Sequence, residues 1–223
     1  YVLRVLGIVS KGSDMDKRLV QSLIIRNDLE EAKSEIIRKG LIRSVAHVKT
    51  AFSAFHNLCE LEKSIRSMYA YNREFSGLYK DCRTNAEFFS YLRNKFTGHL
   101  TDDLIEKSFE WKPEIRLTLE RHHDADVILI YNFWLLETAI NTYVDADGYN
   151  KVFGSETDLQ YPPDFKRFEL TLIAAIDQAT KFLSSVEAAL KPTVSPPTTE
   201  DEKMWLFKKA GRTDFAYITK KAR

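Results

Sequence analysis

The sequence predicts an all-α protein: an up-down helical bundle with a short C-terminal appendage. Apolar residues recur at the spacing of an amphipathic helix along most of the chain, and only eight glycines and six prolines interrupt its 223 residues. The longest uncharged apolar run, from Val127 to Leu136, is about half of the ~20 residues that a membrane-spanning helix needs. We therefore expect one domain that does not enter a membrane.

The composition argues against several classes of protein. The 33 basic and 32 acidic residues leave a formal charge of +1, so no global charge points to nucleic acid or to an anionic membrane. The first nine residues are too short and too interrupted for a secretory signal, and the chain begins with Tyr1 rather than Met. With only two cysteines, the chain is expected to be cytoplasmic and reduced.

Two long helices are predicted in the first third of the chain. The apolar series that begins with Leu19 and Leu23 indicates a helix over residues 15–39, and a second series indicates another over 41–76. Gly40 lies between the two series, so we place the break there.

A third helix is predicted over residues 85–97, and Gly98 stands where a left-handed C-terminal residue would end it. Thr101 is then expected to cap a short fourth helix, because two aspartates follow it in the first turn. This helix should end before Pro113.

The remaining bundle elements are less uniform. Residues 115–120 alternate like a short strand, yet Pro113 could also begin a helix there, so both interpretations stay open. Residues 127–144 are apolar nearly all round and predict the most buried helix. The last long helix is expected to run from Pro162 to about Leu190.

The chain divides by composition into a bundle, residues 1–190, and a Pro/Thr linker followed by an aromatic-basic tail, residues 191–223. The tail contains eight basic and four acidic residues, so it carries +4 and leaves −3 on the bundle. Trp205, Phe207 and the other tail aromatics dock on the bundle or on a second protomer in one interpretation. In the other, they stack on the bases of a nucleic acid.

Arg93, Asn94 and His99 are the candidate site residues, and no metal or cofactor is called for. On an unbroken helix, His99 would lie about 240° around the axis and ~9 Å along it from Arg93. A turn at Gly98 would instead bring the imidazole back toward the last helical turn. Arg93, at the border of the apolar stripe, should be half-buried, whereas Asn94 points away and needs a second helix or subunit to cover it.

These side chains suit metal-independent cleavage of RNA. An imidazole such as His99 can assist the attack of a 2′-hydroxyl or protonate the leaving oxygen. The Arg93 guanidinium can stabilise the charge that develops on phosphorus, and Asn94 can orient the substrate or the imidazole.

A second stretch matches part of this pattern and supports a rival hypothesis. Arg116 precedes His122 and His123 at similar spacing, but no asparagine follows the arginine and no glycine precedes the histidines. Glu120, His122 and Asp126 are also possible metal ligands, so a metal-dependent hydrolase is an alternative. The more ordinary interpretation is a polar loop before an apolar helix.

The string from Leu92 to Asp102, late in a helical chain, resembles the HEPN superfamily, particularly its abortive-infection-like branch. The family signature is Arg, four to six residues, then His, often with a polar residue after the Arg; Arg93, Asn94 and His99 fit it. The resemblance implies a bundle that dimerises so that two motifs form one RNase site. It also implies a toxin–antitoxin or anti-phage role, with RNA as substrate and an antitoxin as a possible partner.

Many members of that superfamily have lost activity, so a catalytically inactive helical interaction or RNA-binding module is the chief alternative. His47 and His56 lie within the predicted second helix without a ligand partner one turn away, and we expect them to be structural or solvent-facing. Cys59 and Cys82 have no nucleophile motif and are expected to serve packing.

Overall fold

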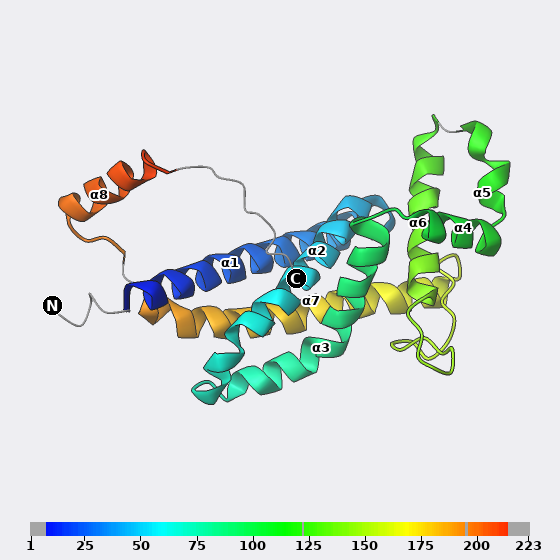
Figure 1. Cartoon of the computed structure of the whole chain (residues 1–223). Helices are drawn as coiled ribbons and strands as arrows, with labels where there is room; N and C mark the ends of the chain where they lie inside the picture. Colours follow the sequence, from blue (N-terminus) through cyan, green and yellow to red (C-terminus); the bar gives the residue numbers. More distant parts are fainter. Residues whose placement is uncertain (1–7, 122, 195, 214–223) are drawn as a thin grey trace.

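The computed structural model describes residues 8–121, 123–194 and 196–213, and these residues form an all-α protein, as predicted (Figure 1). Its helices are α1 (Ile8–Lys39), α2 (Val45–Ile65), α3 (Glu74–Leu92), α4 (Asp102–Trp111), α5 (Glu114–Leu117), α6 (Ala125–Asn141), α7 (Pro162–Leu190) and α8 (Glu200–Ala210). Among the described residues, no helix is both long and apolar enough to cross a lipid bilayer.

Helices α1, α2, α3 and α7 pack around one core and form the elongated body of the molecule (Figure 1). Phe89 of α3 lies in the middle of this core. Its ring stacks on Phe52 at 5.5 Å and on Phe55 at 5.0 Å between centroids, and all three side chains are buried. The apolar stripes that predict these helices are therefore the surfaces that the helices bury against one another.

The predicted break at Gly40 is confirmed. Helix α1 ends at Lys39, and Gly40 follows with φ +79°, a left-handed conformation that residues with a Cβ rarely adopt. The chain then reverses so that α2 packs against α1.

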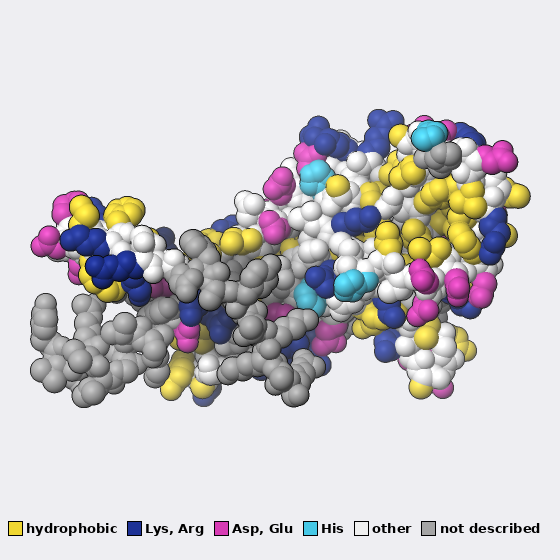
Figure 2. Space-filling view, turned by 45° about the horizontal axis from the view of Figure 1, so that its top comes forward, with side chains coloured by type: hydrophobic (Ala, Val, Ile, Leu, Met, Phe, Trp, Pro, Cys, Tyr) yellow, Lys and Arg dark blue, Asp and Glu magenta, His cyan; other side chains and the backbone are white. Residues whose placement is uncertain are grey.

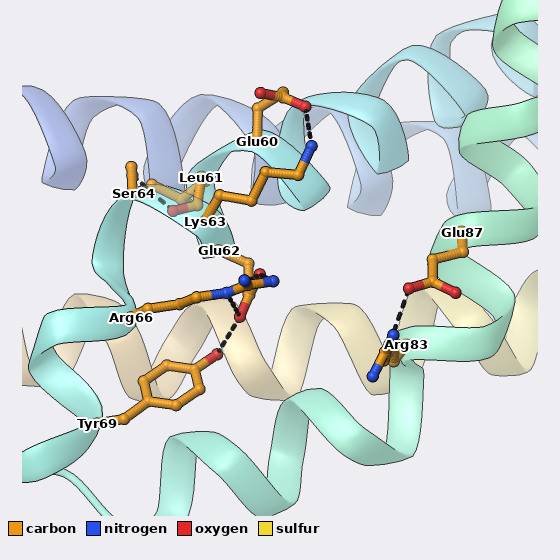
Figure 3. Close-up of polar contacts among 9 residues, drawn as sticks. All are labelled: Glu60, Leu61, Glu62, Lys63, Ser64, Arg66, Tyr69, Arg83 and Glu87. Atoms are coloured by element: carbon orange, nitrogen blue, oxygen red, sulfur yellow. Dashed lines mark hydrogen bonds and ion pairs between the residues drawn. The ribbon is translucent and has the colours of Figure 1, made fainter.

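The prediction of one helix over 41–76 is wrong, because α2 ends at Ile65 and a 3-10 helix covers Arg66–Ala70. The buried carboxylate of Glu62 accepts hydrogen bonds from the Arg66 guanidinium at 2.9 Å and from the Tyr69 hydroxyl at 3.1 Å (Figure 3). These bonds hold the tighter turn against the end of α2, where no glycine or proline marks a break in the sequence.

The third helix begins at Glu74, well before the predicted start at residue 85. It passes at Leu92 into a π-helical turn, Arg93–Thr97. Gly98 has φ −78°, so the expected left-handed residue is absent at this position. Gly98 instead allows the Arg93 guanidinium to lie close to the backbone.

The side arm of the molecule consists of α4, α5 and α6 (Figure 1). Thr101 caps α4 as predicted, since its hydroxyl accepts a hydrogen bond from the Leu104 amide. After Pro113 the chain forms the short helix α5, which settles the open choice over residues 115–120 in favour of helix.

Helix α6 is not the most buried helix, contrary to prediction. It spans Ala125–Asn141, and its N-terminal half exposes Ile128 and Ile130 because only one face of the arm packs on the body. The last long helix, α7, has the predicted limits Pro162 and Leu190.

The tail contains a helix, α8, that the sequence analysis did not predict. None of its side chains is buried, and Trp205 and Phe207 are 59% and 74% exposed. The predicted docking of these rings on the bundle is therefore not observed. The predicted tail residues 214–223 lie outside the described part of the chain.

Candidate functional site

The site predicted from Arg93, Asn94 and His99 lies at the π-helical turn that ends α3. The Gly98 amide donates to the Arg93 carbonyl at 2.6 Å, a bond between residues five apart rather than four. Such single π turns are rare in proteins and frequently occur at functional sites. Within this turn, the Thr97 hydroxyl is buried and has no hydrogen-bond partner among the described residues, which is uncommon for a buried polar atom.

The π turn brings Arg93 and Gly98 into contact. A Cβ atom at Gly98 would lie 3.0 Å from Nη1 of Arg93 and 3.3 Å from its Cζ. The guanidinium therefore lies directly against the backbone of the residue before His99. Gly98 is needed here for this close approach and not for a left-handed φ.

Asn94 contacts the guanidinium of Arg93. Its Oδ1 accepts a hydrogen bond from Nη1 of Arg93 at 3.1 Å. Arg93 is half-buried, as predicted from its place at the border of the stripe, and Asn94 and His99 are exposed. The structure thus brings Arg93, Asn94 and the backbone next to His99 together on one turn.

His56 of α2 also lies at this turn, although it is 37 positions away from Arg93 in the sequence. Its Nδ1 is 3.0 Å from the Ser90 hydroxyl, on the last turn of α3. Burial lowers the pKa of His56 below its usual 6.5, and the positive charge of Arg93 lowers it further. Glu60 and Lys63 make smaller contributions to this pKa, in opposite directions. His56 is therefore a neutral imidazole beside a permanent cation.

Lys49 extends the site along α2. Its ammonium lies 4.6 Å from the centre of the Phe96 ring in the π turn and donates to Oδ1 of Asn132, on α6, at 2.7 Å. Burial lowers the pKa of Lys49. Lys49, Ser53 and His56 are four and then three residues apart, a spacing that places them on one face of the helix. A polar stripe on an otherwise apolar helix is the sequence signal that could have identified these residues as part of the site.

The cations at this turn lack the acidic partner that four other half-buried cations have; half-buried Arg18, whose printed hydrogen bond is to the Gln21 amide oxygen, also has none among the described residues. Arg26, Lys33, Lys112 and Arg167 each form an ion pair with a carboxylate. In the part of the chain that the structure describes, neither Lys49 nor Arg93 forms one. Because half-buried cations are usually compensated, two uncompensated cations around one turn form a candidate site for an anion such as a phosphate.

In the second stretch, the described residues have other roles. Asp124 caps α6 through the Asp126 amide and pairs with Arg121, while Arg116 lies over the Phe109 ring at 4.6 Å. No group of three metal-ligating side chains occurs among the described residues; His122 lies outside them. Here the acidic side chain of Asp124 is engaged in stabilising the helix start.

Cys59 and Cys82 are buried, as expected for packing residues. Burial raises the pKa of the Cys59 thiol to about 11 and that of Cys82 to about 12. Both are therefore protonated near neutral pH and are poor nucleophiles.

Comparison with known proteins adds no relative, since no family model, no curated protein and no solved structure matches the chain.

Proposed function

We propose that the protein is a metal-independent endoribonuclease whose site is the π turn at the end of α3. The observation that supports this most is the half-buried Arg93, which has no acidic partner among the residues that the structure describes and lies against the glycine that precedes His99. A guanidinium held against the residue that precedes an exposed histidine is suited to a phosphodiester.

In this proposal, the 2′-oxygen of a ribose attacks the adjacent phosphorus and the bond to the 5′-oxygen of the next nucleotide breaks. His56 takes the proton from the 2′-hydroxyl: with Nδ1 donating to Ser90, its Nε2 is the free basic nitrogen. His99 donates a proton to the departing oxygen, and Arg93 stabilises the charge on phosphorus. The products are a 2′,3′-cyclic phosphate and a 5′-hydroxyl.

The protein acts as a homodimer in this proposal, with two π turns at one site. An exposed apolar surface on the side arm supports an interface there. Exposed apolar side chains of the arm include Leu117, 83% exposed, with Leu119, Ile128 and Ile130. Figure 2 shows a broad hydrophobic area over this arm, and α6 packs directly against the π turn. Apolar patches of this kind commonly mark protein–protein contacts.

A light-scattering measurement tests the dimer. We expect a mass of twice the 25.9 kDa chain for the wild type, and a shift toward monomer for Leu117→Glu, which places a charge in the interface. A monomeric wild type across micromolar concentrations would contradict the composite site. A toxin–antitoxin or anti-phage role, with an antitoxin as partner, rests on the resemblance of the Arg93–His99 string to the HEPN superfamily.

The alternative is a helical interaction module without catalysis. The exposed apolar arm and the exposed rings of Trp205 and Phe207 favour it, because such surfaces bind proteins regardless of chemistry at the π turn.

Cleavage of a labelled single-stranded RNA by the purified full-length protein separates the two. We expect cyclic-phosphate products, no inhibition by EDTA, and a loss of about 10²-fold in His99→Ala. Arg116→Ala, at the rival locus, is the matched control and should cleave like the wild type. A wild type that does not cleave RNA would favour the interaction module, whereas a His99→Ala variant that cleaves equally well and melts normally would contradict the assignment of His99 as a catalytic residue.

A further inference from the structure

A cavity of about 380 Å³ lies between α4, the C-terminal end of α6 and the loop that follows α6. Figure 1 shows these segments together at one end of the molecule. Its volume falls within the range of about 300–1,000 Å³ typical of small-ligand sites. Nothing in the cleavage chemistry proposed above uses this cavity.

Two aromatic side chains line the cavity and remain accessible: Trp111, 39% exposed, and Tyr149, 62% exposed. Trp111 is held in place, because its indole nitrogen donates to the buried Glu137 carboxylate at 2.7 Å. Within the described residues, the Tyr149 side chain makes no hydrogen bond or ring contact. Accessible aromatic walls of this kind suit a planar ligand that stacks, such as a nucleobase.

The cavity is connected to the π turn. Thr142 lines the cavity, and the Tyr91 hydroxyl donates to its carbonyl at 3.1 Å and lies 2.9 Å from its hydroxyl. Tyr91 is two residues before Arg93 on the same helix. The surface that carries the proposed chemistry therefore continues, through Tyr91, to the edge of the cavity.

Aromatic rings and lysines alternate along this connection. Tyr91 packs on Tyr143 at 4.8 Å between ring centres, Lys95 lies 5.9 Å from the Tyr91 ring, and Lys151 lies 5.1 Å from the Tyr143 ring. Among the described residues, neither lysine forms an ion pair. The Glu87 carboxylate lies near Tyr143 but is paired with Arg83. Surfaces that bind single-stranded nucleic acid combine rings and cations in this way.

We propose that the cavity binds a base of the RNA strand whose scissile phosphate lies at Arg93. The base stacks on Tyr149 and Trp111, and Lys95 and Lys151 contact the phosphates between the cavity and the π turn. This inference rests on the proposed function, which it extends by assigning single-stranded RNA as the substrate and a second recognition site to it.

The cavity also carries a preference among bases. The Glu156 carboxylate lines it and can accept hydrogen bonds from an exocyclic amino group. Adenine, cytosine and guanine have such a group, whereas uracil does not. Oligouridine should therefore bind more weakly than oligoadenosine of equal length.

The test measures the anisotropy of a fluorescein-labelled oligoadenosine on the full-length protein, in a His99→Ala background, in which cleavage is expected to be about 10²-fold slower. Tyr149→Ala should weaken binding roughly 5- to 100-fold, the cost of one lost base–aromatic stack. Tyr149→Trp, which keeps an aromatic surface, should restore it. Tyr71→Ala removes a ring that is 90% exposed and away from the cavity, and should have no effect.

Equal affinities for Tyr149→Ala and Tyr71→Ala, or no binding of the oligonucleotide at all, would overturn the cavity assignment. Binding of AMP as tightly as the oligonucleotide would overturn the assignment to an RNA strand. Cleavage by the wild type is scored separately. A protein that cleaves RNA while Tyr149→Ala binds normally loses only the cavity assignment, and one that binds through Tyr149 without cleaving loses only the nuclease assignment.

Discussion

Two seams between packed helices contain half-buried cations. In one seam the cations form ion pairs with carboxylates, and in the other they do not. Between α1 and α7, Arg26 pairs with Glu187 at 2.9 Å and Lys33 pairs with Asp177. Between α2 and the π turn, Lys49 and Arg93 donate hydrogen bonds to the amide oxygens of Asn132 and Asn94, and neither forms an ion pair with a described residue.

The difference separates charges that serve the fold from charges available to a ligand. In the first seam, the carboxylate already supplies the compensation that a half-buried cation needs, so little attraction remains for an external anion. In the second, neutral amides orient the cations without neutralising them. A phosphate that arrives at the π turn therefore meets positive charge that has not been offset.

Among variants that test the contrast between the two seams, Gly98→Ala is expected to have the largest effect, a loss of RNA cleavage. The new Cβ would lie 3.0 Å from Nη1 of Arg93 and 3.2 Å from the Arg93 carbonyl oxygen, so both the guanidinium and the backbone of the π turn must shift. We expect RNA cleavage to fall by about 10²-fold, as for a catalytic group displaced by ~1 Å, and the melting temperature to fall slightly because the turn is strained. Gly77→Ala, which has open space around its Cβ, is the matched control and should leave cleavage unchanged.

For the free energy of unfolding, we expect a larger effect in the seam between α1 and α7 than at the π turn. Arg26→Ala leaves the Glu187 carboxylate half-buried with the Ser22 hydroxyl as its one remaining partner among the described residues, so the free energy of unfolding should fall by about 1–3 kcal/mol. Arg93→Ala removes a hydrogen bond to the neutral Asn94 amide and leaves no described carboxylate unpaired, so the free energy of unfolding should fall by less than about 1 kcal/mol. Urea unfolding followed by circular dichroism measures both. Equal losses would contradict the distinction between the two seams.

The smallest effect concerns the pKa of His56, which NMR titration of its ring resonances reports. We expect a value below 6.5, because burial and the Arg93 charge both disfavour the imidazolium. Arg93→Ala should raise the pKa only partway toward 6.5, since burial is the larger cause.

The lowered pKa of His56 also sets how the free energy of unfolding depends on pH. A His whose pKa is lowered in the folded state contributes stability that is fully present above 6.5 and is lost as the pH falls toward the folded-state value. A His56 pKa above 6.5 would contradict the lowering that burial and the Arg93 charge are expected to cause.

The sequence predicts the elements whose ends are set by local chemistry. Gly40, Thr101 and Pro162 each mark a helix boundary through their own conformational or capping preference, and the structure places boundaries at all three. The break after Ile65 depends on how the buried Glu62 holds Arg66 and Tyr69, which no local signal reveals.

The same division applies to the site. Arg93, Asn94 and His99 are visible in one short string, and the half-burial of Arg93 follows from its place on the stripe. The π turn, the contact of Arg93 with Gly98 and the approach of His56 are tertiary features. They depend on α2 packing against the end of α3, which helical periodicity does not specify.

The central claim is that Arg93 and His99 act on one phosphate, and a double-mutant cycle on RNA cleavage tests it most directly. Rates are measured for the wild type, Arg93→Ala, His99→Ala and the double variant, in EDTA and with equal melting temperatures as the condition for comparison. We predict a loss of at least about 10²-fold in each single variant and little further loss in the double variant, because groups that act as a unit are not additive. Losses that multiply in the double variant, or a single variant with wild-type cleavage, would contradict the claim.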